Sequence, residues 1–516
     1  MFIGELRPFQ QEAVEQLLDK QCLLLALHLG LGKTVCSIAA IEKLFEEEKI
    51  TKALIICTAS LKFQWQREID KFAPNSKVLV IDGSPKERLE QYGQVSNYDY
   101  VIITYEQLIN DWLQIKNLPV EVVVADECVA IKNPKTKRAR RLKRLTPEYR
   151  FGLTGQPIEN RPEELFSIMQ WVDPKVLGRF DIFDRTYIVR NGFGGVQRYK
   201  NLPTLREKMS EAMYRKTREE VASQLPALSE ETLLIDFDSS SAVLYRHIVR
   251  ALLADLAEAS SQLGTSFNLY SHYQGESEEE NYWRGQIMSK MTCLRMLCDH
   301  PQLLKISADK FDNTDILGGS TYANQLAHEG RLSKITSSPK FDEAISLCKQ
   351  IFTESPTNKL VLFSFFKPTL SLLQEKLSEE GYQTVQFHGG MNAKDRDKNK
   401  LLFQNSPEVK AFLSSDAGGV GIDLPQANYS INFDLPWSSG KLTQRNGRID
   451  RISSEFSNIT IINLLIKGSL EERQYEMLTQ KAKISAAWLD GKGLDTKGGI
   501  ILDLKTLTEF LKNSTV

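Results

Sequence analysis

The 516-residue sequence predicts an α/β protein made of two units of similar plan, each a mostly parallel sheet covered by helices, with a helical insertion between them. Two observations lead to this prediction. Short runs rich in Val, Ile and Leu recur in both halves without polar alternation, which is typical of parallel strands covered on both faces. Longer mixed stretches with helical periodicity lie between several of these runs, as the crossovers between parallel strands require.

Six apolar runs in the first 155 residues are the expected strands of the first unit, and a helical run at 35–47 follows the first of them. They are residues 22–27, 53–57, 78–81, 100–104, 121–125 and 150–154. The second unit has five runs of the same character, with a helical stretch at 367–380 between the first two. They are residues 360–365, 384–387, 411–414, 429–433 and 459–465.

The segment from about 161 to 338 differs, because its pattern is mostly helical, as in residues 242–262 and 283–297. We therefore predict a first domain at residues 1–230 and a second at 231–516, with the helical insertion at about 240–335. The chain is long enough for a sizeable core in each domain.

The composition is that of an ordinary globular protein, with 41% apolar and 25% charged residues. Lys and Arg total 65 against 66 Asp and Glu, so a polyanion binder of this charge must concentrate its positive residues locally. The seven cysteines include no C-x-x-C pair, which predicts buried free thiols rather than disulfides or a zinc site. We recognise no secretory signal and no membrane-spanning run, so we expect an intracellular, cytoplasmic protein without a membrane partner.

The run at 22–27 leads into a turn with two glycines, Gly30 and Gly32, and then into Lys33 and Thr34 at the start of a helical run. Backbone N–H groups and the helix N-terminus in such a turn face an anion. Lys33 would reach the β- and γ-phosphates of a nucleotide, and the Thr34 hydroxyl would bind Mg²⁺. The complete pattern also requires a glycine where Leu27 stands, so this segment is not sufficient by itself.

The run at 121–125 leads directly into Asp126 and Glu127. An apolar strand that ends in acids places carboxylates at the carboxyl edge of a parallel sheet, where ligands bind. Asp126 can hold Mg²⁺, and Glu127 can orient or deprotonate an attacking water. Together with the upstream Gly-Lys-Thr, these acids indicate a nucleotide-hydrolysing site.

Arg448 and Arg451 stand three apart in the segment 444–451, and they share a face if this segment is helical. Charge that develops on a γ-phosphate during its transfer needs cations in the transition state. Arginines supplied by the second unit would allow hydrolysis only when the cleft between the two units closes.

These residues, with others in the same order, resemble the motifs of the Swi/Snf-type ATPases of helicase superfamily two. The resemblance runs from Leu6 to about Leu478 and includes the segments 30–34 (GLGKT), 126–133 (DECVAIKN), 153–160 (LTGQPIEN), 414–424 (SSDAGGVGIDL) and 444–451 (QRNGRIDR). It implies two RecA-like lobes that bind ATP and Mg²⁺ in the cleft between them. It also implies that Gln10 reads the adenine edge, and that Gly419 belongs to the nucleotide site.

The resemblance further implies contacts with double-stranded DNA. Hydroxyl, glycine and aromatic residues in the motifs of both lobes would approach the duplex: Thr58, Ser60, Thr104, Tyr105, Ser364, Gly389, Ser415 and Trp437. A basic cluster follows the acidic motif, with eight Lys and Arg residues between positions 132 and 144. We expect Lys137, Arg138 and Arg141 of this cluster to contact phosphates and to make DNA binding dependent on salt.

The sequence departs from the family pattern at three places. Leu27, His28 and Leu29 stand where the family usually has an acidic pair and methionine, Val129 stands where it has His or Gln, and Gln156 replaces Thr. Val129 cannot hydrogen-bond through its side chain, so we expect the coupling between the ATP and DNA sites to be looser or to follow another route. The residues expected to act in hydrolysis are retained: Lys33, Glu127, Arg448 and Arg451.

The function that the resemblance implies is an ATP-dependent DNA translocase that moves along double-stranded DNA and remodels DNA or protein–DNA complexes. Cycles of lobe closure and opening would step the protein along the phosphate backbone. Two alternatives remain open: a strand-separating DNA or RNA helicase with the same ATP machinery, and a nucleic-acid-binding scaffold that does not hydrolyse ATP. The small size and the lack of appended modules suggest a protein of a bacterium or of a phage-infected host cell.

Overall fold

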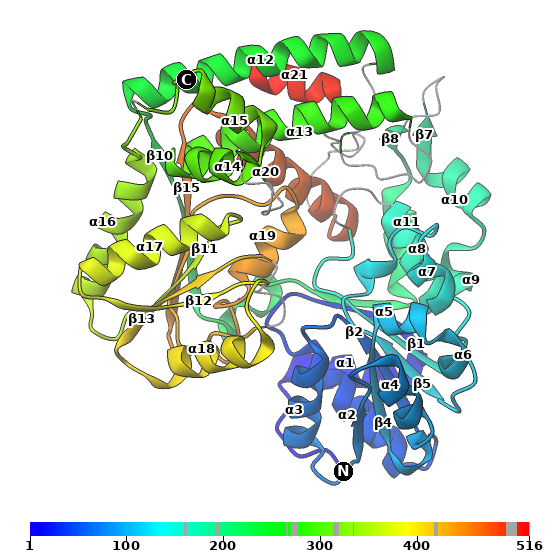
Figure 1. The fold of residues 1–516 in the computed structure, drawn as a ribbon. Coiled ribbons are helices and arrows are strands. Elements are labelled where there is room, and N and C mark those ends of the chain that lie inside the picture. The colour runs from blue at the N-terminus through cyan, green and yellow to red at the C-terminus, as the bar shows by residue number, and fades with distance from the viewer. Residues whose placement is uncertain are drawn as a thin grey trace.

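The structure, a computed structural model, describes residues 1–158, 163–190, 196–264, 267, 269, 277–312, 319–333, 335–416, 422–491, 503–514 and 516. Two α/β lobes lie next to each other, and a group of helices lies over the far end of the second lobe (Figure 1). Each lobe has its own sheet, and every described pairing within these two sheets is parallel. The predicted fold class is confirmed.

The first lobe contains a seven-stranded sheet with the order β3-β4-β2-β5-β6-β1-β9. Its strands are β1 (Cys22–Leu27), β2 (Ala53–Cys57), β3 (Val78–Val80), β4 (Tyr100–Thr104), β5 (Val122–Ala125), β6 (Tyr149–Leu153) and β9 (Met213–Lys216). Its α-helices are α1 (Pro8–Lys20), α2 (Lys33–Glu46), α3 (Lys62–Phe72), α4 (Pro85–Tyr92), α5 (Tyr105–Asn110), α6 (Trp112–Ile115), α7 (Lys137–Leu142), α8 (Glu163–Val172), α9 (Pro174–Leu177), α10 (Phe180–Tyr187) and α11 (Leu202–Ser210). An antiparallel hairpin of β7 (Ile188–Arg190) and β8 (Val196–Tyr199) stands apart from the sheet.

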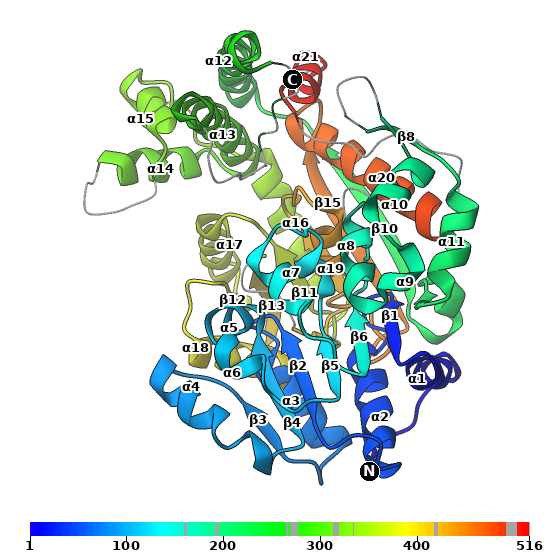
Figure 2. The same ribbon diagram turned by 90° about the vertical axis from the view of Figure 1, so that its right-hand side faces the viewer.

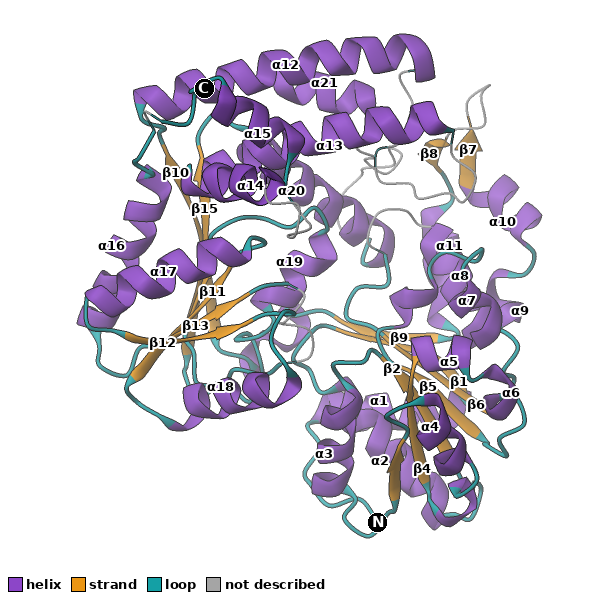
Figure 3. Ribbon diagram, viewed as in Figure 1, coloured by secondary structure: helices purple, strands orange, loops and turns teal. Residues whose placement is uncertain are grey.

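Helices cover this sheet (Figure 3), and a buried apolar cluster lies on each of its faces, which explains why its strands show no polar alternation. Leu24 packs in the cluster on one face, whereas Leu23 and Leu25 pack in the cluster on the other. All three side chains are fully buried. Successive residues of a strand point to opposite faces, so a strand covered on both sides needs apolar residues at every position.

The second lobe contains a six-stranded sheet with the order β10-β15-β14-β11-β13-β12. Its strands are β10 (Ala227–Ile235), β11 (Leu360–Phe363), β12 (Gln383–Phe387), β13 (Val409–Ser414), β14 (Tyr429–Asn432) and β15 (Asn458–Ile466). Its helices are α16 (Pro339–Glu354), α17 (Lys367–Glu379), α18 (Ala393–Asn405), α19 (Ser439–Asn446) and α20 (Leu470–Leu489). The predicted helical insertion is present and shares one apolar cluster with the C-terminal helix: α12 (Ser239–Leu263), α13 (Glu278–Asp299), α14 (Gln302–Asp312), α15 (Thr321–His328) and α21 (Leu504–Lys512).

The chain passes from one sheet to the other between β9 and β10, so the boundary between the lobes lies at residues 217–226. The predicted boundary between residues 230 and 231 falls inside β10, which pairs with β15 over its whole length, so the second sheet already begins at Ala227. The mostly helical character predicted for residues 161–338 is incomplete, because this region also holds β7 to β10. β9 and β10 are the outer strands of their sheets, so their side chains are partly exposed and their sequences are too polar to show as apolar runs.

Helix α20 connects the lobes a second time (Figure 2). It follows β15 and ends against the first lobe, where the Trp488 and Tyr199 rings pack edge to face with centroids 4.2 Å apart. Arg215 of β9 forms an ion pair with Asp490, just past the end of α20, at 2.5 Å. The lobes are therefore tied together at α20 as well as through the chain between β9 and β10.

All seven cysteines are free thiols, and six of them are buried. In the part of the chain that the structure describes, no group of three or more His, Cys, Asp or Glu residues could hold a metal ion. None of the described helices has both the length and the apolar character that crossing a bilayer requires.

Candidate active site

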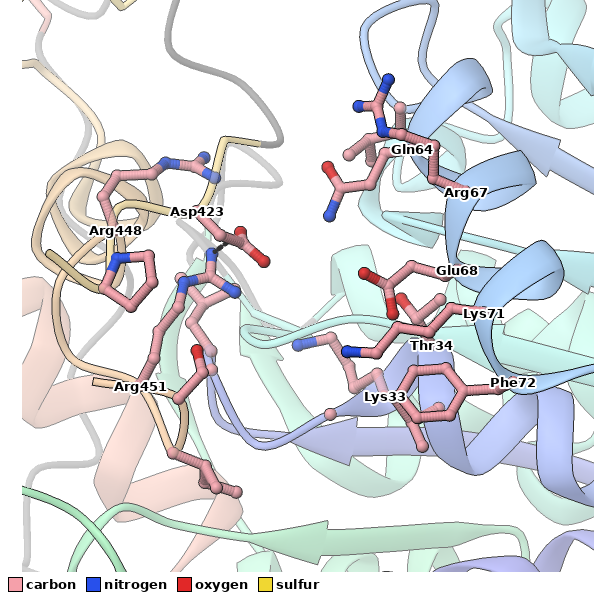
Figure 4. Close-up of a pocket in the computed structure, with 18 of the residues that line it drawn as sticks. Lys33, Thr34, Gln64, Arg67, Glu68, Lys71, Phe72, Asp423, Arg448 and Arg451 are labelled. Carbon is pink, nitrogen blue, oxygen red and sulfur yellow. Dashed lines mark ion pairs between the residues drawn. The ribbon is translucent and has the colours of Figure 1, made fainter. Parts of the chain in front are cut away.

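A cavity of about 710 Å³ lies between the two lobes. The first lobe contributes the turn after β1, the acids after β5 and one side of α3, and the second lobe contributes α18 and the segment after α19 (Figure 4). The cavity is lined by all the described residues that we predicted for nucleotide binding and hydrolysis: Gln10, Gly30, Gly32, Lys33, Thr34, Asp126, Glu127, Arg448 and Arg451. Gly419 lies outside the described residues.

The turn between β1 and α2 is shaped by two glycines in the left-handed region, Gly30 at φ +80° and Gly32 at φ +83°. Among the described residues, no side chain caps the N-terminus of α2, so the N–H groups of its first turn suit an anion. Lys33, the first residue of α2, donates from Nζ to the Leu27 carbonyl at 3.2 Å. Burial lowers the pKa of Lys33, and the two carboxylates after β5 oppose this effect.

Asp126 and Glu127 follow β5 and face the same turn. The Asp126 carboxylate is buried and accepts hydrogen bonds from Trp65 Nε1 at 2.8 Å and from the Glu127 N–H at 2.9 Å. Burial raises the pKa of Asp126, while the Trp65 hydrogen bond and the Lys33 charge lower it. Glu127 has φ +47°, a left-handed conformation that is unfavourable for a non-glycine residue and recurs at functional sites. The acids are thus held in fixed positions in the cavity wall.

Arg448 and Arg451 enter the cavity from the second lobe (Figure 4). Helix α19 ends at Asn446, so both arginines lie in the turn after it and do not share a helical face. Arg448 Nη1 donates to the Ile422 carbonyl at 3.1 Å, and burial together with the charge of Arg451 lowers the pKa of Arg448 to about 10. Arg451 Nη2 forms an ion pair with Asp423 Oδ1 at 2.7 Å. With a pKa of about 10, Arg448 remains a cation at neutral pH.

The two lobes touch at the turn after β1. The Ile452 N–H of the second lobe lies 3.5 Å from the Gly30 carbonyl oxygen. Leu29 fits between glycines of both lobes, since a Cβ at Gly155 would be 2.8 Å from Leu29 Cδ2 and a Cβ at Gly447 would be 2.9 Å from Leu29 Cβ. These close approaches hold the arginine segment beside the turn that suits a phosphate.

Gln10 and His28 are fixed next to this turn by backbone groups. Gln10 Nε2 donates to the Leu31 carbonyl at 3.1 Å, and Gln10 Oε1 accepts from the Arg7 N–H at 2.9 Å. The His28 N–H donates to the Lys216 carbonyl at 3.0 Å, and burial lowers the pKa of His28 to about 4. His28 is therefore neutral at pH 7, which fits a local structural role better than acid–base chemistry.

One wall of the cavity has no counterpart among the predicted site residues. Helix α3 points four polar side chains into the cavity: Gln64, Arg67, Glu68 and Lys71 (Figure 4). Lys400 of α18 lies opposite, and burial and the charge of Arg67 lower its pKa. The only signal of this wall in the sequence is the i, i+3, i+4, i+7 spacing, which places the four residues on one helical face.

The residues predicted to contact DNA fall into two groups. The exposed or half-buried group consists of Thr58, Ser60, Lys137, Arg138, Arg141, Gly389 and Trp437. The Thr58 and Ser60 hydroxyls lie 3.2 Å apart after β2, and Arg141 lies over the Trp112 ring at 4.8 Å. Lys143 of the basic cluster turns inward and donates to a hydroxyl of α8 at 2.9 Å. The basic cluster therefore presents only part of its charge to solvent.

The second group is buried in this arrangement of the chain, so its side chains do not present themselves to solvent: Thr104, Tyr105, Ser364 and Ser415. Thr104 Oγ1 accepts from a backbone N–H of α5 at 3.1 Å. The Tyr105 hydroxyl donates to the Asp126 carbonyl at 2.8 Å, and the Ser364 hydroxyl donates to Asp434 Oδ2 at 2.7 Å. The hydroxyls of Thr104, Tyr105 and Ser364 therefore have partners inside the protein.

Comparison with protein families agrees with this geometry. The SNF2-related domain matches residues 9–303, more than half of the chain, and the helicase conserved C-terminal domain matches residues 342–453. The chain belongs to the SNF2 family. Together with relatives that are ATP-dependent helicases, these matches confirm the predicted enzyme class of this SNF2-family chain, a DNA-dependent ATPase of helicase superfamily two.

Several relatives match this SNF2-family chain over nearly its whole length. The uncharacterized ATP-dependent helicase YqhH of Bacillus subtilis (strain 168) is 26% identical over 478 residues, which cover 92% of this chain and 78% of YqhH. DNA repair and recombination protein RAD54B of Homo sapiens is 26% identical over 528 residues, which cover 95% of this chain but only 55% of RAD54B. The helicase domain of Pyrococcus furiosus Hef has the same fold, with a TM-score of 0.54 at 15% identity, over 91% of this chain and 97% of that domain.

Proposed function

We propose that this SNF2-family protein hydrolyses ATP in the cavity between its lobes and uses the cycle of lobe closure and opening to move along double-stranded DNA. One observation carries the proposal: charged residues of both lobes line a single cavity, with Lys33 on one side and Arg448 and Arg451 on the other. A site shared in this way is complete only when the lobes are together. Hydrolysis would therefore be coupled to lobe movement.

The residues of the cavity divide the chemistry between them. Lys33 binds the β- and γ-phosphates, together with the N–H groups at the start of α2. Glu127 orients the attacking water and accepts its proton. Arg448 and Arg451 stabilise the charge that develops on the γ-phosphate in the transition state. Gln10, which lines the cavity, is proposed to read the adenine edge, and Gly30 and Gly32 would let the backbone approach the nucleotide. Gly419, which the resemblance also assigns to the nucleotide site, lies outside the described residues.

The cavity also has residues that fit a Mg²⁺ ion, which takes one or two protein oxygens and completes its shell with phosphate oxygens and water. Thr34 and Asp126 both line the cavity. Each Asp126 oxygen accepts one N–H bond, which leaves lone pairs for a cation, and the buried charge of Asp126 is one that a cation would stabilise. Thr34 and Asp126 would hold the ion, and the ion would neutralise phosphate charge.

Double-stranded DNA is proposed as the track. Thr58 and Ser60 follow a strand of the first lobe, and Gly389 and Trp437 follow strands of the second. The basic cluster supplies positive charge at the surface: Lys137, Arg138 and Arg141. Such groups hold phosphates without reading bases. The names of the relatives support DNA as the substrate, since RAD54B is a DNA repair and recombination protein and YqhH an ATP-dependent helicase.

Steady-state ATPase rates with duplex DNA, single-stranded DNA and RNA, measured side by side, test this proposal. Blunt duplex should stimulate the rate most, and Lys33→Ala or Glu127→Gln should each remove the stimulated rate. Turnover that Glu127→Gln leaves unchanged would contradict hydrolysis in this cavity and favour a scaffold. Strand displacement on a forked duplex, with no stimulation by blunt duplex, would contradict translocation on double-stranded DNA and favour a strand-separating helicase.

A further inference from the structure

Phe365 is a large apolar side chain at the surface of the second lobe, with 51% of its area exposed. It lies two residues beyond β11, so it stands at the same carboxyl edge of the sheet as Gly389, two residues beyond β12. Its backbone is fixed, because the Phe365 N–H donates to Asp434 Oδ2 at 2.7 Å. Single exposed apolar residues are common, so the surroundings of Phe365 decide what it can bind.

A buried cation supports the inner side of the Phe365 ring. The guanidinium carbon of Arg295, on α13, lies 4.8 Å from the centroid of this ring, 5.6 Å from that of Phe366 and 6.0 Å from that of Trp437. Arg295 itself is buried and donates from Nη2 to the Leu435 carbonyl at 3.1 Å. The cation–π contact restrains the ring in one orientation, so little side-chain entropy remains to be lost when its exposed face is covered.

Groups that suit phosphates lie at the same edge of the sheet as Phe365. Lys367 is exposed, and its Nζ lies 2.7 Å from the position that a Cβ at Gly390 would take. Gly390 therefore leaves room for this ammonium beside the exposed loop that contains Gly389. In a duplex the bases stay paired, so an ordered aromatic ring can meet only sugars and base edges at a groove, while a nearby ammonium and glycine loop hold phosphates.

We propose that Phe365 contacts sugar and base edges of the DNA strand held by the second lobe, while Lys367 binds an adjacent phosphate. This inference rests on the proposed function, because it adds a contact to the same DNA site. Covering an apolar ring releases no counterions, so Phe365 adds affinity that does not depend on salt. Lys367 adds affinity that does depend on salt, and this difference distinguishes the two contacts.

The affinity of the full chain for a blunt duplex, measured over a range of salt concentrations, tests the inference. Phe365→Ala should weaken binding about 5- to 10-fold, as expected when the exposed half of a phenylalanine side chain is no longer covered, and leave the slope of log K against log salt unchanged. Lys367→Ala should weaken binding and reduce that slope by about one. Phe180→Ala is the matched control, because Phe180 is also a surface phenylalanine, 46% exposed, but it packs on Phe166 and belongs to α10 of the first lobe. The affinity of the Phe180→Ala variant for the duplex should equal that of the unsubstituted protein.

A second substitution separates a lost contact from a damaged fold. Phe365→Trp keeps an aromatic ring at the same place and should retain most of the affinity, so equal losses in Phe365→Trp and Phe365→Ala would overturn the inference. Unchanged binding of duplex by Phe365→Ala would also overturn it, would leave the proposed function standing, and would point to another occupant of this surface. Absence of duplex binding by the unsubstituted protein would overturn the inference and the proposed function together.

Discussion

Replacing Gly155 by alanine is expected to slow ATP hydrolysis through Leu29, which lies between glycines of the two lobes. The new methyl group would be 2.8 Å from Leu29 Cδ2 and 2.9 Å from Leu29 Cγ. On its other side Leu29 packs against the backbone of Gly447, since its Cβ lies 2.9 Å from where a Cβ of Gly447 would be. Ordinary contacts begin at 3.4 Å. Leu29 or the segment against it must therefore move by about 0.5 Å.

A movement of this size should reach the catalytic arginines of the proposed mechanism, since Gly447 directly precedes Arg448. A misplacement of about 1 Å can slow an enzyme about 10²-fold, so about 0.5 Å predicts a kcat roughly 10-fold lower. The affinity for ATP should change less, because the methyl group acts on the contact between the lobes and not on Lys33. The crowding itself should lower stability by about 1–3 kcal/mol.

A double-mutant cycle of duplex-stimulated ATPase rates tests this reasoning. Leu29→Ala removes Cγ and both Cδ atoms, so the double substitution should recover most of the kcat that Gly155→Ala loses. Gly285→Ala is the control, because no described atom lies within 4 Å of its new methyl group inside α13; full activity and a slightly higher unfolding temperature are expected. Losses that simply add in the double variant would refute the reasoning, since steric overlap would then not be their cause.

Arg451→Ala should lower kcat far more than it weakens ATP binding, because a guanidinium that meets the γ-phosphate acts mainly in the transition state; equal losses would contradict this role. Lys137→Ala combined with Arg138→Ala should weaken duplex binding and reduce its salt slope by up to about two, and an unchanged slope would exclude both residues from the DNA site. His28 has a pKa of about 4 in the folded protein against an ordinary 6.5. As the pH falls from 6.5 towards 4 the unfolded chain takes up this proton first, so up to about 3 kcal/mol of stability is lost across that window. His28→Gln should flatten the pH dependence of thermal unfolding there, whereas an identical profile would show that His28 does not cause the loss.

The central strands were predicted to within two residues at each end because burial on both faces leaves a strong pattern. β1 and β2 begin and end as expected, since every residue in them must be apolar. β9 and β10 were missed for the opposite reason. They are outer strands, and β10 carries Glu230 and Glu231 on exposed positions, so neither strand stands out from a helix or loop in sequence. The predicted domain boundary falls inside β10 because this strand does not stand out in the sequence.

Sequence reasoning found the parts of the candidate site that lie in contiguous motifs and missed the parts that depend on packing. Lys33 and the two acids come from single turns after strands, so spacing along the chain was enough to bring them together. The wall formed by α3 comes from a helix without a motif, and only the tertiary fold turns Arg67 and Glu68 towards Lys400. The burial of Tyr105 and Ser364 could not be predicted either. The sequence of a motif does not indicate whether a hydroxyl in it faces solvent or a partner inside the protein.

Two departures from the family pattern meet at one place between the lobes. A small cavity there, of about 10 Å³, has Glu127, Val129 and Gln444 in its walls. Val129 offers no hydrogen-bonding group, but Gln156 in the same wall donates from Nε2 to Ser439 Oγ of the second lobe at 3.2 Å. The threonine hydroxyl oxygen is one bond from Cβ, whereas the glutamine amide nitrogen is three bonds from Cβ. Gln156 can therefore bond to a more distant partner than a threonine at this position could. A neutral amide–hydroxyl bond contributes on the order of 1 kcal/mol and is not screened by salt. Gln156 therefore supplies a polar link between the lobes at a place where Val129 offers none, and this link should persist at ionic strengths that release DNA.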